Sequence, residues 1–64
     1  MSEKKVLIVE DELTVAEETA AMIQHLGHKT TGIAVSGEEA VLLAQKEQPD
    51  LVLMDIRLRG TLME

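Results

Sequence analysis

The sequence feature that most constrains the fold is a continuous apolar run that leads directly into a carboxylate. The run is Leu51-Val52-Leu53-Met54, with Asp55 after it and the turn-forming pair Pro49-Asp50 before it. An apolar run of this length between turn signals is typical of a strand that is buried on both faces, as in a parallel sheet. A carboxylate at the end of such a strand is costly to place unless it has a role. We therefore look for function at this end of the strand.

A second run with the same pattern lies near the N-terminus. Here Val6-Leu7-Ile8-Val9 is followed by Glu10-Asp11-Glu12. If the two strands are parallel neighbours, their carboxyl ends bring Glu10, Asp11 and Asp55 to one rim of the sheet. Ligands of open α/β sheets bind at this rim, outside the carboxyl ends of the strands.

The segment between the two runs has the periodicity of helices. We expect a first helix over residues 13–26, followed by Gly27 as a C-terminal stop signal. Apolar residues at three- and four-residue spacings form its expected buried face: Leu13, Ala16, Ala20, Ile23 and Leu26.

A second helix is expected over residues 37–47. It begins with a capping box in which Ser36 caps the helix and Glu39 reaches back. Its expected sheet-facing residues are Ala40, Val41 and Ala44, flanked by Leu43. Residues 28–34 are typical of a weaker strand at a sheet edge. The order is therefore β-α-β-α-β, and helical crossovers of this length require parallel strands.

Composition narrows the classes of function. The 64 residues include 12 acidic and 6 basic side chains, for a net charge of −6, and neither cysteine nor any aromatic residue. This charge argues against direct binding to nucleic acid or to an anionic membrane, and a chain without aromatic residues cannot stack bases. The N-terminus is too short for a signal peptide or a membrane span. We expect a cytoplasmic protein with no membrane contact.

The three carboxylates at the expected rim repel one another, and a hard cation would resolve this repulsion. Mg²⁺ prefers oxygen ligands and usually takes one or two protein carboxylates together with water and phosphate oxygens. A carboxylate beside such a cation can also attack phosphorus and form an acyl phosphate. The alternative is a set of solvated loop acids, since strand ends are commonly polar.

The chain resembles a known family over residues 4–60. Three segments carry the resemblance: Val6-Leu7-Ile8-Val9-Glu10-Asp11-Glu12, Ser36-Gly37-Glu38-Glu39-Ala40, and Pro49-Asp50-Leu51-Val52-Leu53-Met54-Asp55-Ile56-Arg57-Leu58. These three segments, at the spacing they have here, are similar to the N-terminal half of a response-regulator receiver domain of two-component signalling. The resemblance implies a flavodoxin-like α/β fold, here only its βαβαβ half, with a three-stranded parallel sheet in the order 2-1-3.

The resemblance also implies a set of roles for residues at the rim. Asp55 resembles the aspartate that accepts the phosphoryl group, and Glu10 and Asp11 resemble the acidic pair that binds Mg²⁺. Asp55 would also bind the metal ion, and Arg57 would bind it through its backbone carbonyl. In the family a histidine kinase donates the phosphoryl group, so we expect a signalling acceptor rather than an enzyme.

The chain departs from the family after Gly60. Residues 1–64 would form a partial receiver domain that lacks the family's fourth and fifth strands, and with them a Thr or Ser and a Lys that act on the phosphoryl group. We therefore expect weak or absent phosphorylation of this chain alone.

Two other functions stay open. One is an assembly module without chemistry. The other is a Mg²⁺-dependent aspartyl phosphohydrolase, which the sequence Glu10-Asp11-Glu12 disfavours because a common class of these enzymes carries Asp-x-Asp there.

The strand order has a consequence for assembly. In the order 2-1-3 the third strand, Leu51 to Met54, becomes an edge that presents unpaired backbone groups and two apolar faces. We therefore expect a homodimer, or a larger assembly, that forms through this strand and depends on protein concentration.

Overall fold

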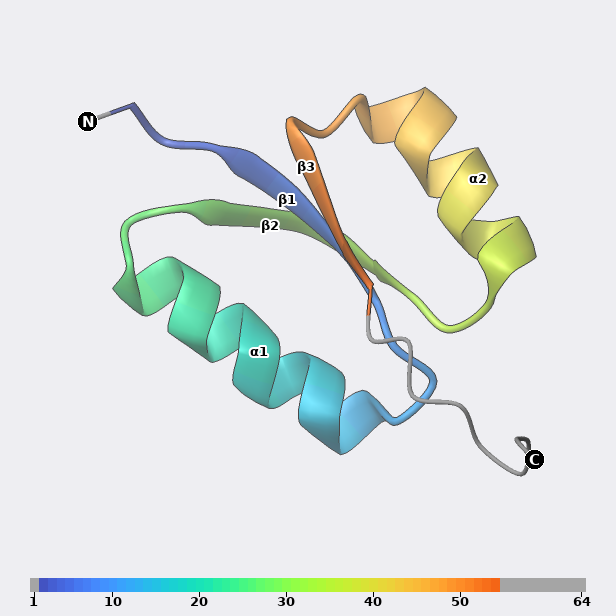
Figure 1. The fold of residues 1–64 in the computed structure, drawn as a ribbon, viewed down its shortest axis with the longest axis horizontal. Coiled ribbons are helices and arrows are strands. Elements are labelled where there is room, and N and C mark those ends of the chain that lie inside the picture. The colour runs from blue at the N-terminus through green and yellow to red at the C-terminus, as the bar shows by residue number, and fades with distance from the viewer. Residues whose placement is uncertain (1, 55–64) are drawn as a thin grey trace, which may run out of the picture.

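Three parallel strands and two helices alternate along the chain in the computed structural model, which describes residues 2–54. In chain order these elements are β1 (Lys5–Val9), α1 (Leu13–His25), β2 (Lys29–Ala34), α2 (Gly37–Glu47) and β3 (Leu51–Met54). The sheet order is β2-β1-β3 with all neighbours parallel, which confirms the expected topology. The two helices lie on opposite sides of the sheet (Figure 1).

The hydrophobic core consists of two thin layers that share the central strand. On one face of the sheet, Val6 and Ile8 of β1 pack with Ala16 and Ile23 of α1. The other face holds a layer formed by the side chains Leu7, Val9, Ala34 and Ala40. Because successive side chains of a strand point to opposite faces, β1 supplies both layers. This is why its residues from Val6 to Val9 are at most 9% exposed.

Strand β3 takes its place in the sheet from its pairing with β1. Val6 lies opposite Leu51, and the register continues without a break to Val9 opposite Met54. Leu51 and Leu53 therefore belong to the α1 face, and Val52 and Met54 belong to the α2 face.

The burial of β3 differs from the expectation of a strand covered on both faces. All four of its side chains are between 42% and 55% exposed. The physical reason is its position, since β3 is an edge strand and packs only against β1 among the described elements. The expected edge position is thus confirmed, and the expected burial of the Leu51–Met54 run is wrong for the part of the chain that the structure describes.

The end residues of the predicted apolar face of α1 are not buried. Ala16 and Ile23 are buried and Ala20 packs against them, but Leu13 is 57% exposed and Leu26 is 65% exposed. Leu13 is the first helical residue and Leu26 is the C-cap, beyond the helix end at His25. Both exposed residues therefore stand at the ends of the helix, outside the stretch from Ala16 to Ile23 that packs against the core.

Helix α2 begins as expected, with one difference in its capping box. The Ser36 hydroxyl accepts a hydrogen bond from Glu39 N–H at 3.2 Å, while the Glu39 carboxylate accepts from Val35 N–H at 2.8 Å. Ala40 and Ala44 contact the core as expected, but Val41 is 57% exposed and Leu43 packs against the core in its place.

Neither described helix is long and apolar enough to span a bilayer.

Candidate functional site

Glu10 is the carboxylate that the fold places most firmly. It directly follows β1, and its N–H donates to the carbonyl of Ala34, the last residue of β2, at 2.8 Å. Its side chain is only 5% exposed, and Glu10 is the one charged residue buried among residues 2–54. A buried carboxylate needs polar partners or a cation, because removing its charge from water is costly.

The Glu10 carboxylate is tied to the start of the following helix. Its Oε2 atom accepts a hydrogen bond from the N–H of Glu12, the N-cap residue of α1, at 3.0 Å. Negative charge is favourable at a helix N-terminus, where N–H groups point outward from the helix. The turn from β1 into α1 therefore fixes the direction of this side chain.

A cavity of about 210 Å³ adjoins Glu10 between α1 and β3. Its walls are mostly apolar, with Ile8 and Val9 from β1, Val15 from α1, and Leu53 and Met54 from β3. The polar residues that line the cavity are Glu10 and Thr19. A carboxylate beside apolar walls interacts more strongly with a cation than a carboxylate in open water does.

The predicted site residues fall into two groups. Glu10 is buried and its neighbour Asp11 is exposed, and both lie at the carboxyl end of β1 as the sequence predicts. Asp55 and Arg57 lie outside the described residues. The register nevertheless ends with Val9 opposite Met54, and the next residues in sequence are Glu10 and Asp55. Within residues 2–54, no group of three or more His, Cys, Asp or Glu side chains could hold a metal ion.

The described part of the site fits a hard cation as a partial ligand set. Adjacent carboxylates, one buried and one exposed, offer the oxygen donors that Mg²⁺ prefers, and Mg²⁺ commonly takes only one or two protein carboxylates. Glu10 and Asp11 are the described residues that would hold the ion.

Two interactions that the sequence did not predict support the opposite end of the sheet. The Asp50 carboxylate accepts from Lys5 N–H at 2.8 Å, and Asp50 N–H donates to the Lys5 carbonyl at the same distance. These bonds join the start of β3 to β1. The imidazole Nδ1 of His28 accepts from Lys4 N–H at 3.0 Å. The Pro49-Asp50 pair indicated a turn, but no sequence signal pointed to the long-range partner of Asp50.

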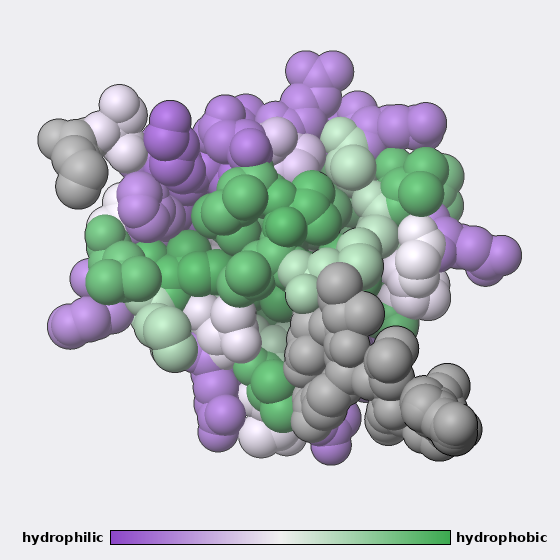
Figure 2. All heavy atoms as spheres, viewed as in Figure 1, coloured by the Kyte–Doolittle hydropathy of each residue, from purple (hydrophilic) through white to green (hydrophobic). Residues whose placement is uncertain are grey.

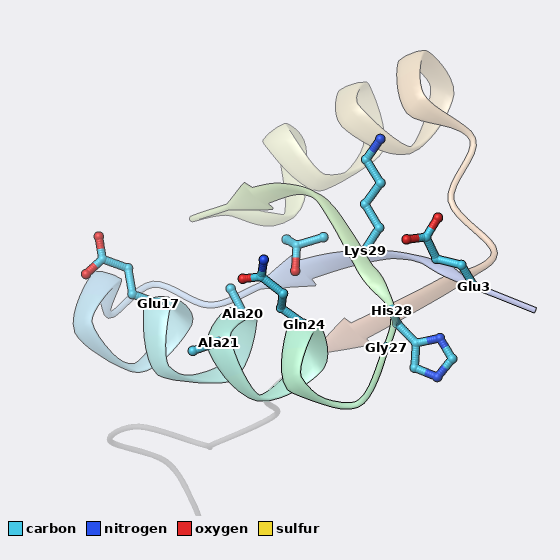
Figure 3. A pocket seen from close by; sticks show the side chains of 9 residues that line it. Glu3, Glu17, Ala20, Ala21, Gln24, Gly27, His28 and Lys29 are labelled. Atoms are coloured by element: carbon cyan, nitrogen blue, oxygen red, sulfur yellow. The ribbon is translucent and has the colours of Figure 1, made fainter.

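The larger cavity of the described chain lies away from the acidic pair. It has a volume of about 580 Å³ and is bordered by α1 and the start of β2 (Figure 3). The residues that line it include two acids, Glu3 and Glu17, and one base, Lys29. Glu3 precedes β1 and Glu17 lies within α1, so neither acid stands at the carboxyl end of a strand, where the sequence predicts the site.

Comparison with known proteins identifies relatives over most of the chain. Residues 6–62 match the family described as the response regulator receiver domain. The transcriptional regulatory protein PdtaR of Mycobacterium tuberculosis is 42% identical over 55 residues, which cover 86% of this chain and 27% of PdtaR. Protein PilH of Pseudomonas aeruginosa is 41% identical over 56 residues, covering 88% of this chain and 46% of PilH.

Solved structures show the same relationship. The anti-anti-sigma factor PhyR from Bartonella quintana superposes with a TM-score of 0.87 at 37% identity, over 94% of this chain and 24% of that one. The response regulator PhyR from Brucella abortus gives a TM-score of 0.84 at 39% identity, over 92% and 24% of the two chains. This chain therefore spans about a quarter of the length of PdtaR and PhyR, and less than half of PilH.

Proposed function

Because the chain belongs to the response-regulator receiver family, we propose that it is a phosphoacceptor module of two-component signalling. In this proposal Asp55 accepts a phosphoryl group from a histidine kinase in the cytoplasm. Glu10, Asp11, Asp55 and the backbone carbonyl of Arg57 hold Mg²⁺. The chain acts as an acceptor in a signalling relay and does not turn over a substrate as an enzyme.

The buried carboxylate of Glu10 is the observation that carries the proposal. It lies at the end of the central strand, next to an exposed acid and beside an apolar cavity. The neighbouring strand β3 ends in register with β1, and the sequence there continues into Asp55. Burial of a carboxylate is costly unless hydrogen bonds or a cation offset the loss of water, and a bound cation at this rim would add to the bond from Glu12 N–H.

The proposed chemistry moves one phosphoryl group. A carboxylate oxygen of Asp55 forms a bond to phosphorus, and the bond between phosphorus and the donor breaks, so the product is an acyl phosphate. Bound Mg²⁺ would supply positive charge that offsets the charge on the transferring group. Glu10 and Asp11 would hold the ion, and the hydrogen bond from Glu12 N–H keeps the Glu10 carboxylate oriented.

Intact-mass measurement after incubation with Mg²⁺ and a small acyl phosphate tests the proposal. We expect addition of one phosphoryl group, lost in Asp55→Asn and retained in Asp50→Asn, which changes the acid at the other end of β3. Equal labelling of the two variants would contradict the assignment of Asp55. Release of inorganic phosphate without a labelled protein would instead favour a phosphohydrolase.

Magnesium binding is tested separately, by titrating Mg²⁺ and following backbone amide shifts. We expect residues 10–12 and 55–58 to shift first, and the shifts to be much weaker in Glu10→Gln. Shifts spread evenly over the exposed acids of α1 and α2 would contradict a metal site at this rim.

A further inference from the structure

Two loops hold the start of the central strand from opposite sides, each with one side chain. The imidazole Nδ1 of His28 accepts a hydrogen bond from Lys4 N–H at 3.0 Å, and the Asp50 carboxylate accepts one from Lys5 N–H at 2.8 Å. Each acceptor directly precedes an outer strand, since β2 follows His28 and β3 follows Asp50. Bonds between backbone groups can form in more than one register, but these two bonds each require one particular residue.

The bond to Asp50 is one half of a two-way contact with Lys5. The Asp50 N–H donates to the Lys5 carbonyl, also at 2.8 Å. The paired register of β1 and β3 begins with the next residues and runs without a break to Val9 opposite Met54. A hydrogen bond to a charged acceptor is stronger than one between neutral groups. Asp50 therefore fastens β3 to β1 at the point where their pairing begins.

The side chains of β3 do not by themselves select this register. All four residues of Leu51–Met54 are apolar, and Leu51 and Leu53 are identical. Figure 2 shows apolar surface over the centre of the molecule, where β3 lies in Figure 1. A shift by two residues keeps every side chain on its face and replaces one apolar residue by another. The register must therefore be set by contacts outside these four side chains.

The connection from α2 leaves a shift possible in one direction. Residues 48–50 join the end of α2 to the start of β3. Helix α2 packs against both β1 and β2, which holds the start of this connection in place. A shift that brings Leu53 opposite Val6 lengthens the connection by two residues, whereas the opposite shift would have to shorten it. The register with Leu53 opposite Val6 is thus the alternative that Asp50 has to exclude.

We propose that Asp50 is a positioning residue that sets the register of β3 against β1, and with it the level at which the chain leaves β3 for Asp55. A strand rises about 3.3 Å per residue, so a shift by two residues moves its end by about 6.6 Å. Mg²⁺ binds its ligands at about 2.0–2.1 Å, so such a shift would separate Asp55 from Glu10 as partners at one ion. The consequence for Asp55 rests on the proposed function, but the register does not.

Asparagine at position 50 separates the hydrogen bond from the charge. Its side-chain carbonyl can accept from Lys5 N–H as the carboxylate does, whereas alanine leaves that N–H without its acceptor. We therefore expect Asp50→Asn to keep the register and Asp50→Ala to lose it. His28→Ala is the matched control, because it removes the corresponding acceptor on the β2 side.

Nuclear Overhauser contacts between backbone protons of neighbouring strands report the register directly. We expect a contact between Val6 and Leu51 in the parent chain, in Asp50→Asn and in His28→Ala. In Asp50→Ala we expect a contact between Val6 and Leu53 to appear and the contact to Leu51 to weaken. An Asp50→Ala chain that is less stable but keeps only the parent contacts would overturn the proposal, because Asp50 would then have a structural role alone.

A second variant removes the other partner of the same bond. Lys5→Pro lacks the N–H donor and keeps the carbonyl, and proline is tolerated at the first residue of a strand. We expect the same new contact between Val6 and Leu53. If Lys5→Pro and Asp50→Ala both lost the fold, the contact would stabilise the sheet as a whole rather than select its register, and the proposal would be overturned.

Titration with Mg²⁺ tests the consequence at the rim. We expect Asp50→Ala to bind Mg²⁺ roughly tenfold or more weakly than the parent, the size typical of residues that orient metal ligands, and Asp50→Asn to bind as the parent does. A shifted register with unchanged Mg²⁺ affinity would overturn the positioning role. A parent chain that binds no Mg²⁺ would instead count against the proposed function, and the backbone contacts alone would then decide whether Asp50 sets the register.

Discussion

At the scale of single residues, the buried carboxylate of Glu10 has two connected roles. Its hydrogen bond from Glu12 N–H stabilises the turn into α1, and its position at the rim would let it bind the proposed Mg²⁺. An amide side chain can accept the same hydrogen bond but has no charge to offer a cation. Substitutions at this position can therefore separate the structural role from the proposed metal role.

Replacing Glu10 by Ala should lower the free energy of unfolding by about 1–3 kcal/mol, because a backbone donor loses its charged acceptor. Glu10→Gln should lose less stability while still losing Mg²⁺ affinity. Urea denaturation with and without Mg²⁺ measures both effects. Glu18→Ala, at an exposed position of α1, should stay within about 0.5 kcal/mol of the parent chain. If Glu10→Gln bound Mg²⁺ as tightly as the parent, Glu10 would have only the structural role.

At the scale of the elements, backbone geometry sets where α1 ends. Gly27 follows the C-cap of α1 at φ +92°, a left-handed conformation that residues with a Cβ rarely adopt. Gly37 is the first residue of α2, and its φ is not positive. A Cβ atom would meet no atom within 4 Å at either position, so steric crowding does not distinguish the two glycines.

The two glycines therefore form a matched pair. Gly27→Ala should destabilise the chain by roughly 1–2 kcal/mol, because the left-handed backbone is strained with a side chain. Gly37→Ala should stabilise it by about 0.4–1 kcal/mol, because alanine restricts the unfolded chain and suits a helix. Thermal unfolding followed by circular dichroism measures both. Equal effects of the same sign would show that φ at Gly27 is not the deciding feature.

At the scale of the whole molecule, one strand connects two small hydrophobic layers. Leu7 is fully buried on the α2 face and Ile8 is 1% exposed on the α1 face. Both layers are small, since each consists of four buried residues of the described chain, with Ala16 in one and Ala34 and Ala40 in the other. A chain of this size buries only about 60% of the surface exposed when it is unfolded.

Truncating either central side chain should therefore unfold both layers together. Leu7→Ala and Ile8→Ala should each cost about 2–5 kcal/mol, which is comparable to the whole stability of a domain of this size. Circular dichroism should show both helices lost at once, whereas Ile8→Val should cost about 0.5–1.5 kcal/mol and stay folded. Retention of part of the helical signal in Leu7→Ala would mean that the two layers fold independently.

The sequence by itself determined the elements of this protein, because their signals are local. Apolar runs, helical spacing, the Ser36 cap and Gly27 predicted five elements close to their observed bounds, and crossover length required parallel strands. The motifs also predicted the family, and the strand ends predicted where Glu10 and Asp11 lie.

The tertiary structure alone decided burial and long-range pairing. An apolar run such as Leu51–Met54 is the same in the centre of a sheet and at its edge, and only the neighbours present determine its exposure. In the same way, Leu26 continues the apolar spacing of α1 but lies beyond the helix end and is exposed, and the bond between Lys5 and Asp50 joins residues 45 positions apart. Such contacts depend on how distant segments meet in space, which local patterns do not encode.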